Sequence, residues 1–195
     1  MDTSSFEFDL APNEFAELSW RYGEPEVRTV SIEADEYLFV SRSHRASHRR
    51  GEVVMVIEPT DGYVLLHRKG WYERGVYRLP TGGIDVDESV EDALFRELDE
   101  ETGLEDGDIR FLGIIDSLIY FQSEAIHFTS YIFHIQNPQG SLSIQHTNED
   151  ISDFYEVTIE ELSDVAENLR NVPPPRTGWG HWRAITHEFV YEALS

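Results

Sequence analysis

The sequence predicts one α/β domain, because short apolar strands and helical segments follow one another along its 195 residues. Residues 53–57 are a continuous apolar run, which is typical of a strand buried on both faces. Residues 87–102 predict a helix that Gly103 ends, and residues 111–115 and 128–135 predict later strands. A chain of this length suits a single domain with a sizeable core.

The segment between the first strand and the helix predicts a hairpin and a loop. Residues 60–62 (Thr-Asp-Gly) supply a turn, so residues 63–67 are expected to return as the hairpin partner of the first strand. Residues 76–79 predict a further short strand that ends at Pro80. Residues 81–83 (Thr-Gly-Gly) are then expected to form a loop before the helix.

The C-terminal part of the chain predicts two helices separated by a bend. Thr158 and Glu161 have the spacing of a capping box, in which each side chain accepts from the other's backbone N–H at the start of a helix. Three consecutive prolines, residues 173–175, predict the bend, and a last helix is expected over residues 182–194.

Residues 1–50 differ in pattern from residues 51–195, so the first part is interpreted as an N-terminal extension of the main domain. Residues 27–30 and 37–40 are β-prone, with a turn between them. The extension is therefore expected to be β-rich, and to pack as a hairpin on the main domain or on a second subunit. A homodimer is compatible with this arrangement, although nothing in the sequence demands it.

The composition excludes several classes of chemistry. There is no cysteine, which rules out disulfides, thiolate metal sites and cysteine nucleophiles. No run reaches the roughly 20 apolar residues that span a bilayer, so no membrane partner is expected. The first residues lack a secretory pattern, and a cytoplasmic location is the resulting expectation.

The charge balance is strongly acidic, with 38 Asp and Glu against 15 Lys and Arg and a formal net charge of −23. Such a surface repels nucleic-acid phosphates, so no nucleic-acid partner is expected. Lys69 is the sole lysine. Adaptation to a salt-loaded cytoplasm and an arginine-biased codon usage both explain this composition, and the choice between them stays open.

The most informative pattern is an acidic helix with glycines at fixed distances from it. It reads Gly82, five residues, Glu88, seven residues, Arg96-Glu97-Leu98, one residue, Glu100-Glu101, one residue, Gly103-Leu104. On a helix that advances about 100° per residue, Glu97, Glu100 and Glu101 fall within about 100° of one another. Three carboxylates on one face repel one another unless a cation neutralises them, and hard oxygen ligands suit Mg²⁺ or Mn²⁺.

This spacing resembles the Nudix box, and each defining position of that motif is present. By element order the resemblance extends over residues 52 to about 165. It implies an α/β/α sandwich around a mixed sheet, in which the box forms a loop-helix-loop. It also implies hydrolysis of a nucleoside diphosphate linked to another group, by attack of metal-activated water on phosphorus.

The resemblance also implies roles for the box residues. The metal ligands would be Glu97, Glu100, Glu101 and the main-chain carbonyl of Gly82. Glu97 or Glu101 would help to deprotonate the attacking water. Arg96 would orient the carboxylates through charge-assisted hydrogen bonds, and Glu88 would support the loop.

A plain alternative is that an acidic protein simply contains an acidic helix. The fixed positions Gly82, Arg96, Leu98, Gly103 and Leu104 argue against coincidence. The motif therefore specifies the fold and the class of chemistry, whereas it says little about the substrate.

Cationic and aromatic residues outside the box are weaker candidates. Arg78 is the preferred substrate-binding cation, with an ordinary surface arginine as its alternative. The arginines of residues 42–50 could bind phosphate, but the favoured interpretation of this stretch is a solvated loop paired with surface acids. Trp179 and Trp182 suit either stacking on a base or packing at a helix start.

A tyrosine and a later carboxylate complete the candidates for substrate binding. Tyr120 lies where family members that act on diadenosine polyphosphates often carry a tyrosine, and its alternative is a core position. Family members usually recruit one more carboxylate from a later loop. Glu149 and Glu124 are favoured here, and Asp150 is the third candidate.

The sequence thus predicts metal-dependent hydrolysis of a phosphoanhydride (diphosphate) bond in a small-molecule nucleotide, with a lean towards a dinucleoside polyphosphate or (d)NTP. The main alternative is a non-catalytic, nucleotide-sensing Nudix module, which has no need for all three box carboxylates. Isopentenyl diphosphate isomerisation usually requires an active-site cysteine, which is absent. A purely structural acidic protein is the last alternative.

Overall fold

The computed structural model describes residues 11–143 and 150–195. Its elements, in chain order, are α1 (Pro12–Tyr22), β1 (Glu26–Glu33), α2 (Glu36–Ala46), β2 (Arg49–Glu58), β3 (Tyr63–Lys69), β4 (Thr81–Asp85), α3 (Val90–Thr102), β5 (Asp108–Phe121), β6 (Glu124–Gln136), β7 (Ile151–Thr158), α4 (Leu162–Arg170) and α5 (Thr177–Leu194). No helix among the described residues is both long and apolar enough to cross a membrane.

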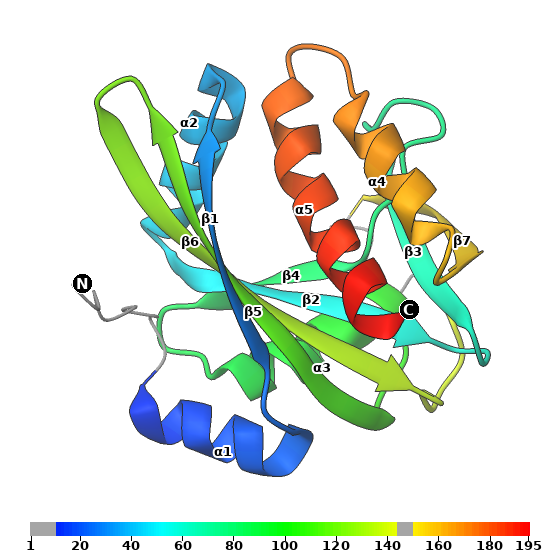
Figure 1. Cartoon of the computed structure of the whole chain (residues 1–195). Coiled ribbons are helices and arrows are strands. Elements are labelled where there is room, and N and C mark those ends of the chain that lie inside the picture. The colour runs from blue at the N-terminus through cyan, green and yellow to red at the C-terminus, as the bar shows by residue number, and fades with distance from the viewer. Residues whose placement is uncertain (1–10, 144–149) are drawn as a thin grey trace.

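Five strands form a mixed sheet in the order β1-β5-β6-β2-β4. The β1–β5 and β2–β6 pairs are parallel, while β5–β6 and β2–β4 are antiparallel. A second, two-stranded antiparallel sheet joins β3 to β7. Helices α4 and α5 cover one side of the five-stranded sheet, and α1 and α3 lie on the other (Figure 1). The observed architecture is the expected α/β/α sandwich around a mixed sheet.

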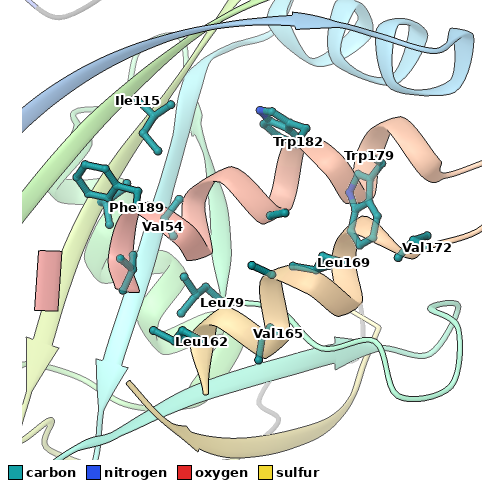
Figure 2. Close-up of a cluster of buried hydrophobic side chains, with 14 of the residues drawn as sticks. Val54, Leu79, Ile115, Leu162, Val165, Leu169, Val172, Trp179, Trp182 and Phe189 are labelled. Atoms are coloured by element: carbon teal, nitrogen blue, oxygen red, sulfur yellow. The ribbon is translucent and has the colours of Figure 1, made fainter. Parts of the chain in front are cut away.

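Strand β2 shows how the sequence builds both cores. Successive side chains of a strand point to opposite faces, so an unbroken apolar run fills two layers. Val53, Met55 and Ile57 join the cluster under α3, whereas Val54 and Val56 join the cluster under α4 and α5. The second cluster includes side chains from both helices and from the sheet (Figure 2). Each fully buried side chain of this kind contributes about 1.5–3 kcal/mol.

Helix α3 has clear start and stop signals. The Ser89 side chain accepts a hydrogen bond from the Asp92 N–H, which satisfies a free donor of the first turn. Gly103 ends the helix in the left-handed conformation, with φ of 71°, which a glycine adopts without steric cost. Leu94 and Leu98 are fully buried against the sheet, so the opposite side of the helix is free to carry polar groups.

The N-terminal segment differs from the expected β-rich hairpin. Residues 26–33 form strand β1, but the predicted strand at residues 37–40 is wrong, because these residues lie in helix α2. The Asp35 side chain caps this helix by accepting from the Leu38 N–H at 2.8 Å. Leu38 and Phe39 then bury one side of it. Capping and tertiary packing override the β-propensity of the local sequence.

Three expectations around the box loop are also wrong. Strand β3 pairs with β7 and not with β2, so residues 53–57 and 63–67 are not hairpin partners. Residues 81–83 belong to strand β4, which pairs with β2 along the sheet edge. Residues 76–79 form only an isolated bridge, between Arg78 and His67.

The later expectations agree with the structure. The strands expected at residues 111–115 and 128–135 are parts of β5 and β6, and the last helix is α5. Thr158 and Glu161 exchange the reciprocal hydrogen bonds of a capping box just before α4.

Candidate active site

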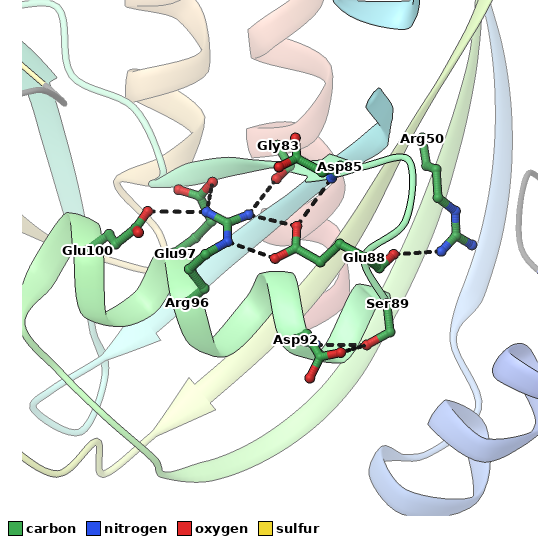
Figure 3. Close-up of polar contacts among 9 residues, drawn as sticks. All are labelled: Arg50, Gly83, Asp85, Glu88, Ser89, Asp92, Arg96, Glu97 and Glu100. Atoms are coloured by element: carbon green, nitrogen blue, oxygen red, sulfur yellow. Dashed lines mark hydrogen bonds and ion pairs between the residues drawn. The ribbon is translucent and has the colours of Figure 1, made fainter. Parts of the chain in front are cut away.

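Arg96 lies at the centre of the acidic motif and binds several of its members at once (Figure 3). Its Nε and Nη2 atoms donate to the two oxygens of Glu88 at 2.7 and 2.8 Å. Its Nη1 atom donates to Glu97 at 2.7 Å and to Glu100 at 3.1 Å, and Nη2 also donates to the carbonyl of Gly83 at 2.9 Å. The arginine therefore ties the loop after β4 to two carboxylates of α3.

These contacts shift the ionisation of both partners. Hydrogen bonding to Glu88 is the main cause of the raised pKa of Arg96, and burial opposes it. The same bond lowers the pKa of the Glu88 carboxyl below its ordinary value. Glu88 also accepts from the Asp85 N–H at 3.1 Å, so this ionised carboxylate supports the loop from within.

Glu97 lies directly against the main chain of β4 at Gly82. The Glu97 side chain is buried, and a Cβ atom added to Gly82 would lie 1.9 Å from its carboxyl carbon. No other residue fits at position 82 unless Glu97 moves. The glycine is thus required for space, and it lets the carboxylate lie close to the backbone.

Glu101 of α3 is fully buried, and its side chain faces residues of strand β3. One carboxylate oxygen is 3.6 Å from Lys69 Nζ, and the other is 3.6 Å from His67 Nδ1. Burial holds the pKa of His67 well below its ordinary value, so the imidazole is neutral near pH 7. The contact between Glu101 and Lys69 is therefore an ion pair, whereas the contact between Glu101 and His67 is not.

The donors that the box itself offers a cation are oxygen atoms, from Glu97, Glu100, Glu101 and the Gly82 carbonyl. This set suits a hard divalent ion. Within residues 11–143 and 150–195, however, no three Asp, Glu or His side chains lie close enough together to hold an ion as they are placed. Glu97 and Glu100 instead share the guanidinium of Arg96.

A cavity of about 290 Å³ opens beside Glu97, and the charged residues that line it are nearly all cations. Six of the chain's 15 Lys and Arg residues line it, namely Arg42, Arg45, Arg49, Lys69, Arg78 and Arg183. Among the described residues in the lining, Glu97 is the only carboxylate. In a chain with a net charge of −23, this concentration of positive charge defines a site for an anion.

Buried hydrogen bonds hold two of these cations in fixed positions. Arg183 donates to both oxygens of Glu52, at 2.6 and 3.0 Å. Burial disfavours the charge of both partners, but Arg183 still holds the pKa of Glu52 below its ordinary value. Arg78 donates to the Tyr72 hydroxyl, the Leu79 carbonyl and the Thr81 hydroxyl.

The structure brings some of the sequence candidates together and separates others. Arg78 lines the cavity with Glu97. Tyr120 is 37% exposed on β5 and lies outside the cavity lining, so its substrate role gains no support from its position. Glu124 begins β6 and lines a different hollow. Glu149 lies outside the described residues.

The favoured interpretation of residues 42–50 as a solvated loop is wrong. These residues end helix α2 and begin strand β2, and Arg42 is only 3% exposed. Because the segment is helical, Arg42 and Arg45 lie almost one turn apart and both reach the cavity. The cationic character of the stretch was the available signal in the sequence. The direction in which its arginine side chains point depends on the fold.

Other cavity residues were missed from the sequence. Arg183 is the only Lys or Arg of residues 177–195, and this isolated cation was its signal. Trp71 lies at the cavity with its ring centroid 6.3 Å from that of Trp179, which the sequence had offered as a stacking or packing residue. The position of His67 beside Glu101 had no signal in the sequence, because it follows from the pairing of β3 with β7.

The fold and the box geometry together define a domain of the Nudix type. In agreement with this, the model of the NUDIX domain family matches residues 48–177, which is about two thirds of the chain. The chain therefore belongs to the Nudix hydrolase family.

Relatives with curated names match only part of this chain, and the matched stretch is less than half of their own length. An RNA pyrophosphohydrolase of Haemophilus influenzae is 43% identical over 60 residues, which cover 28% of this chain and 31% of that protein. Among solved structures, a MutT protein of Bacillus halodurans has a TM-score of 0.52 at 18% identity, and covers 74% of this chain and 82% of its own. The MutT NUDIX hydrolase of Burkholderia pseudomallei has a TM-score of 0.50 at 21% identity, with 75% and 98% covered. These structures support the fold alone.

Proposed function

We propose that this chain hydrolyses a phosphoanhydride bond in a small nucleotide or a related diphosphate compound. The observation that carries the proposal is the position of Glu97. Its carboxylate lines a cavity that holds six Lys and Arg side chains, and it rests against the main chain at Gly82. Positive charge at the cavity attracts a diphosphate group and brings it to the carboxylates of α3.

A divalent cation, Mg²⁺ or Mn²⁺, completes the proposed site. Glu97, Glu100, Glu101 and the Gly82 carbonyl are the residues that would hold it. The oxygen donors of the box fit such an ion, and the absence of a Cβ at position 82 lets the Glu97 carboxylate lie directly against the main chain there. When bound, the cation supplies neutralisation of the diphosphate charge and lowers the pKa of a bound water.

The side chains of the protein bind the phosphates, orient the carboxylates and accept the proton. Arg78 and Lys69 face the cavity, where they bind phosphate oxygens. Arg96 fixes the directions of Glu97 and Glu100 through its hydrogen bonds. Glu97 or Glu101 accepts the proton of the attacking water, which is the usual task of a carboxylate at such a position.

The proposed class of reaction agrees with the name of the Haemophilus relative, an RNA pyrophosphohydrolase. The finer lean towards a dinucleoside polyphosphate was based on Tyr120, which lies outside the cavity. The substrate must therefore be inferred from the cavity itself.

The test is the release of phosphate or pyrophosphate from a panel of nucleoside diphosphate and triphosphate compounds, with Mg²⁺, with Mn²⁺ and with a chelator. We expect release from at least one compound, and only in the presence of the cation. Tight binding of a compound without release from any of them would favour the nucleotide-sensing alternative instead.

A further inference from the structure

Arg42 is a buried cation that faces the cavity without a hydrogen-bond partner for two of its nitrogens. Within the described part of the chain, its Nε and Nη1 atoms have no acceptor, although the residue is only 3% exposed. Its guanidinium lies 4.6 Å from the ring centre of Trp182 and 5.3 Å from that of Phe128. Buried charged donors are costly unless a partner satisfies them, so this side chain indicates a ligand.

Arg45 and Arg49 continue the same wall of the cavity. The added Cβ of Gly83 would lie 2.0 Å from Arg49 Nη1, so the wall begins at the box loop. No carboxylate of residues 11–143 or 150–195 lies within salt-bridge distance of Arg42, Arg45 or Arg49. In this respect they differ from Arg183, which Glu52 neutralises. Three guanidinium groups thus face one cavity without a carboxylate of their own.

Most of this wall is an addition to the Nudix domain. The family model begins at residue 48, whereas Arg42 and Arg45 belong to helix α2 (Glu36–Ala46). The N-terminal segment therefore supplies charge at a place that is separate from the carboxylates of α3. Arginine binds phosphate through paired N–H donors, which makes a phosphate group the best match for this wall.

We propose that Arg42, Arg45 and Arg49 form a subsite for an additional phosphate, so that the preferred substrate is a small molecule with a chain of three or more phosphates. This inference rests on the proposed function, because the other two phosphates flank the bond that is cut. A terminal phosphate carries about 1.5–2 negative charges near neutral pH, which the three cations compensate.

The size of the cavity supports a phosphate chain as its occupant. Its volume of about 290 Å³ is at the lower end of the roughly 300–1,000 Å³ of small-molecule sites. Such a space suits a phosphate chain better than a whole nucleotide. The nucleoside then lies at the mouth, where Tyr37 and Trp71 are 38% and 45% exposed and available for stacking. The net charge of −23 opposes binding of the body of an RNA.

The test is the binding of inorganic triphosphate, measured by titration calorimetry in the presence of a chelator. We expect the unaltered chain to bind it. Arg42→Gln and Arg45→Gln should each weaken binding about tenfold or more, since hydrogen bonds to charged groups are worth about that factor. Arg45 is exposed, so its variant keeps the test informative even if Arg42→Gln does not fold.

Arg170→Gln is the matched control, because Arg170 is an exposed arginine of α4 whose partner is Glu188. Equal binding by the Arg45→Gln variant and the unaltered chain would overturn the subsite, and so would an equal loss in the Arg170→Gln variant. A short RNA with a 5′-triphosphate should bind no tighter than inorganic triphosphate. Tighter binding of that RNA would overturn the assignment to a small molecule.

The two proposals can fail separately. If triphosphate binds through the arginines but no phosphoanhydride is hydrolysed with Mg²⁺ or Mn²⁺, the proposed function fails and the subsite stands. If diphosphate compounds are hydrolysed but the arginine variants bind triphosphate as tightly as the unaltered chain, the subsite fails and the proposed function stands.

Discussion

Helices α3 and α2 face the same cavity with opposite charge. Two carboxylates of α3 are hydrogen-bonded within the motif, because Arg96 binds Glu97 and Glu100 together with Glu88 of the preceding loop. The arginines of α2 have no such partner among the described carboxylates. Arg42 is buried even though two of its nitrogens have no hydrogen-bond acceptor. We infer from this difference that the two helices have separate roles. The carboxylates of α3 are positioned by their own motif, whereas the arginines of α2 are arranged for something that enters the cavity.

The largest expected effect follows from replacing a carboxylate of α3. Glu97→Gln keeps a hydrogen-bond acceptor for Arg96 but removes the charge beside Gly82. Turnover should fall by about two to four orders of magnitude, the usual range for loss of a group that handles the proton. Steady-state phosphate release measures it. Asp99→Asn is the control, since Asp99 is an exposed carboxylate of the same helix, and an equal loss there would contradict the division of tasks.

Box geometry, rather than charge, is tested at position 82. Gly82→Ala places a methyl group 1.9 Å from the carboxyl carbon of Glu97, so the carboxylate must move. Activity should fall by about tenfold or more, because misplacement of a catalytic group by about 1 Å costs up to 10²-fold. Gly70→Ala is the comparison, where the nearest atom is a side-chain oxygen of Asp150 at 3.2 Å. Unchanged activity in Gly82→Ala would show that the close approach is dispensable.

A smaller effect concerns the buried histidine one helical turn after the cavity residue Arg183. His187 is buried in α5, where its Nε2 accepts from the Leu79 N–H and its Nδ1 faces the Arg183 carbonyl. Burial lowers the pKa of His187 to about 3 from an ordinary value of 6.5. The unfolded chain therefore binds a proton below pH 6.5 that the folded chain excludes, and the free energy of unfolding falls as pH falls from 6.5 towards 3.

Chemical denaturation between pH 7 and 5 checks this slope. His187→Gln should flatten it without abolishing it, because His67 is also buried with a lowered pKa and acts in the same direction. His181→Gln, at an exposed position of α5, should leave the slope unchanged. A slope that is the same with and without His187 would show that this histidine does not contribute to the pH dependence.

The contrast between the helices also explains what the sequence could predict. The position of α3 is determined by local signals, Ser89 at its start and Gly103 at its end, and its carboxylate face follows from helical spacing. Helix α2 contains residues 37–40, which were expected to form a strand because they are β-prone. The cap at Asp35 and the packing of the buried Leu38 stabilise a helix instead of a strand.

The pairing of strands that are distant in the sequence also limited what could be predicted for β3. The partner of β3 is β7, almost ninety residues later in the chain, and no turn signal encodes that choice. Lys69 and His67 reach Glu101 only because of this arrangement. The cationic wall forms only because α2 is helical and lies across the sheet from α3. The sequence therefore showed that the arginines are present, but it could not show that their side chains point into one cavity.

The most direct test of this division of tasks compares Glu97→Gln with Arg45→Gln on one nucleoside triphosphate. Separate kcat and KM values should be measured with Mg²⁺ for both variants. The division predicts that Glu97→Gln lowers kcat with little change in KM, whereas Arg45→Gln raises KM by about tenfold and leaves kcat nearly unchanged. If Arg45→Gln lowered kcat as strongly as Glu97→Gln and left KM unchanged, the separation of chemistry on α3 from substrate choice on α2 would be contradicted.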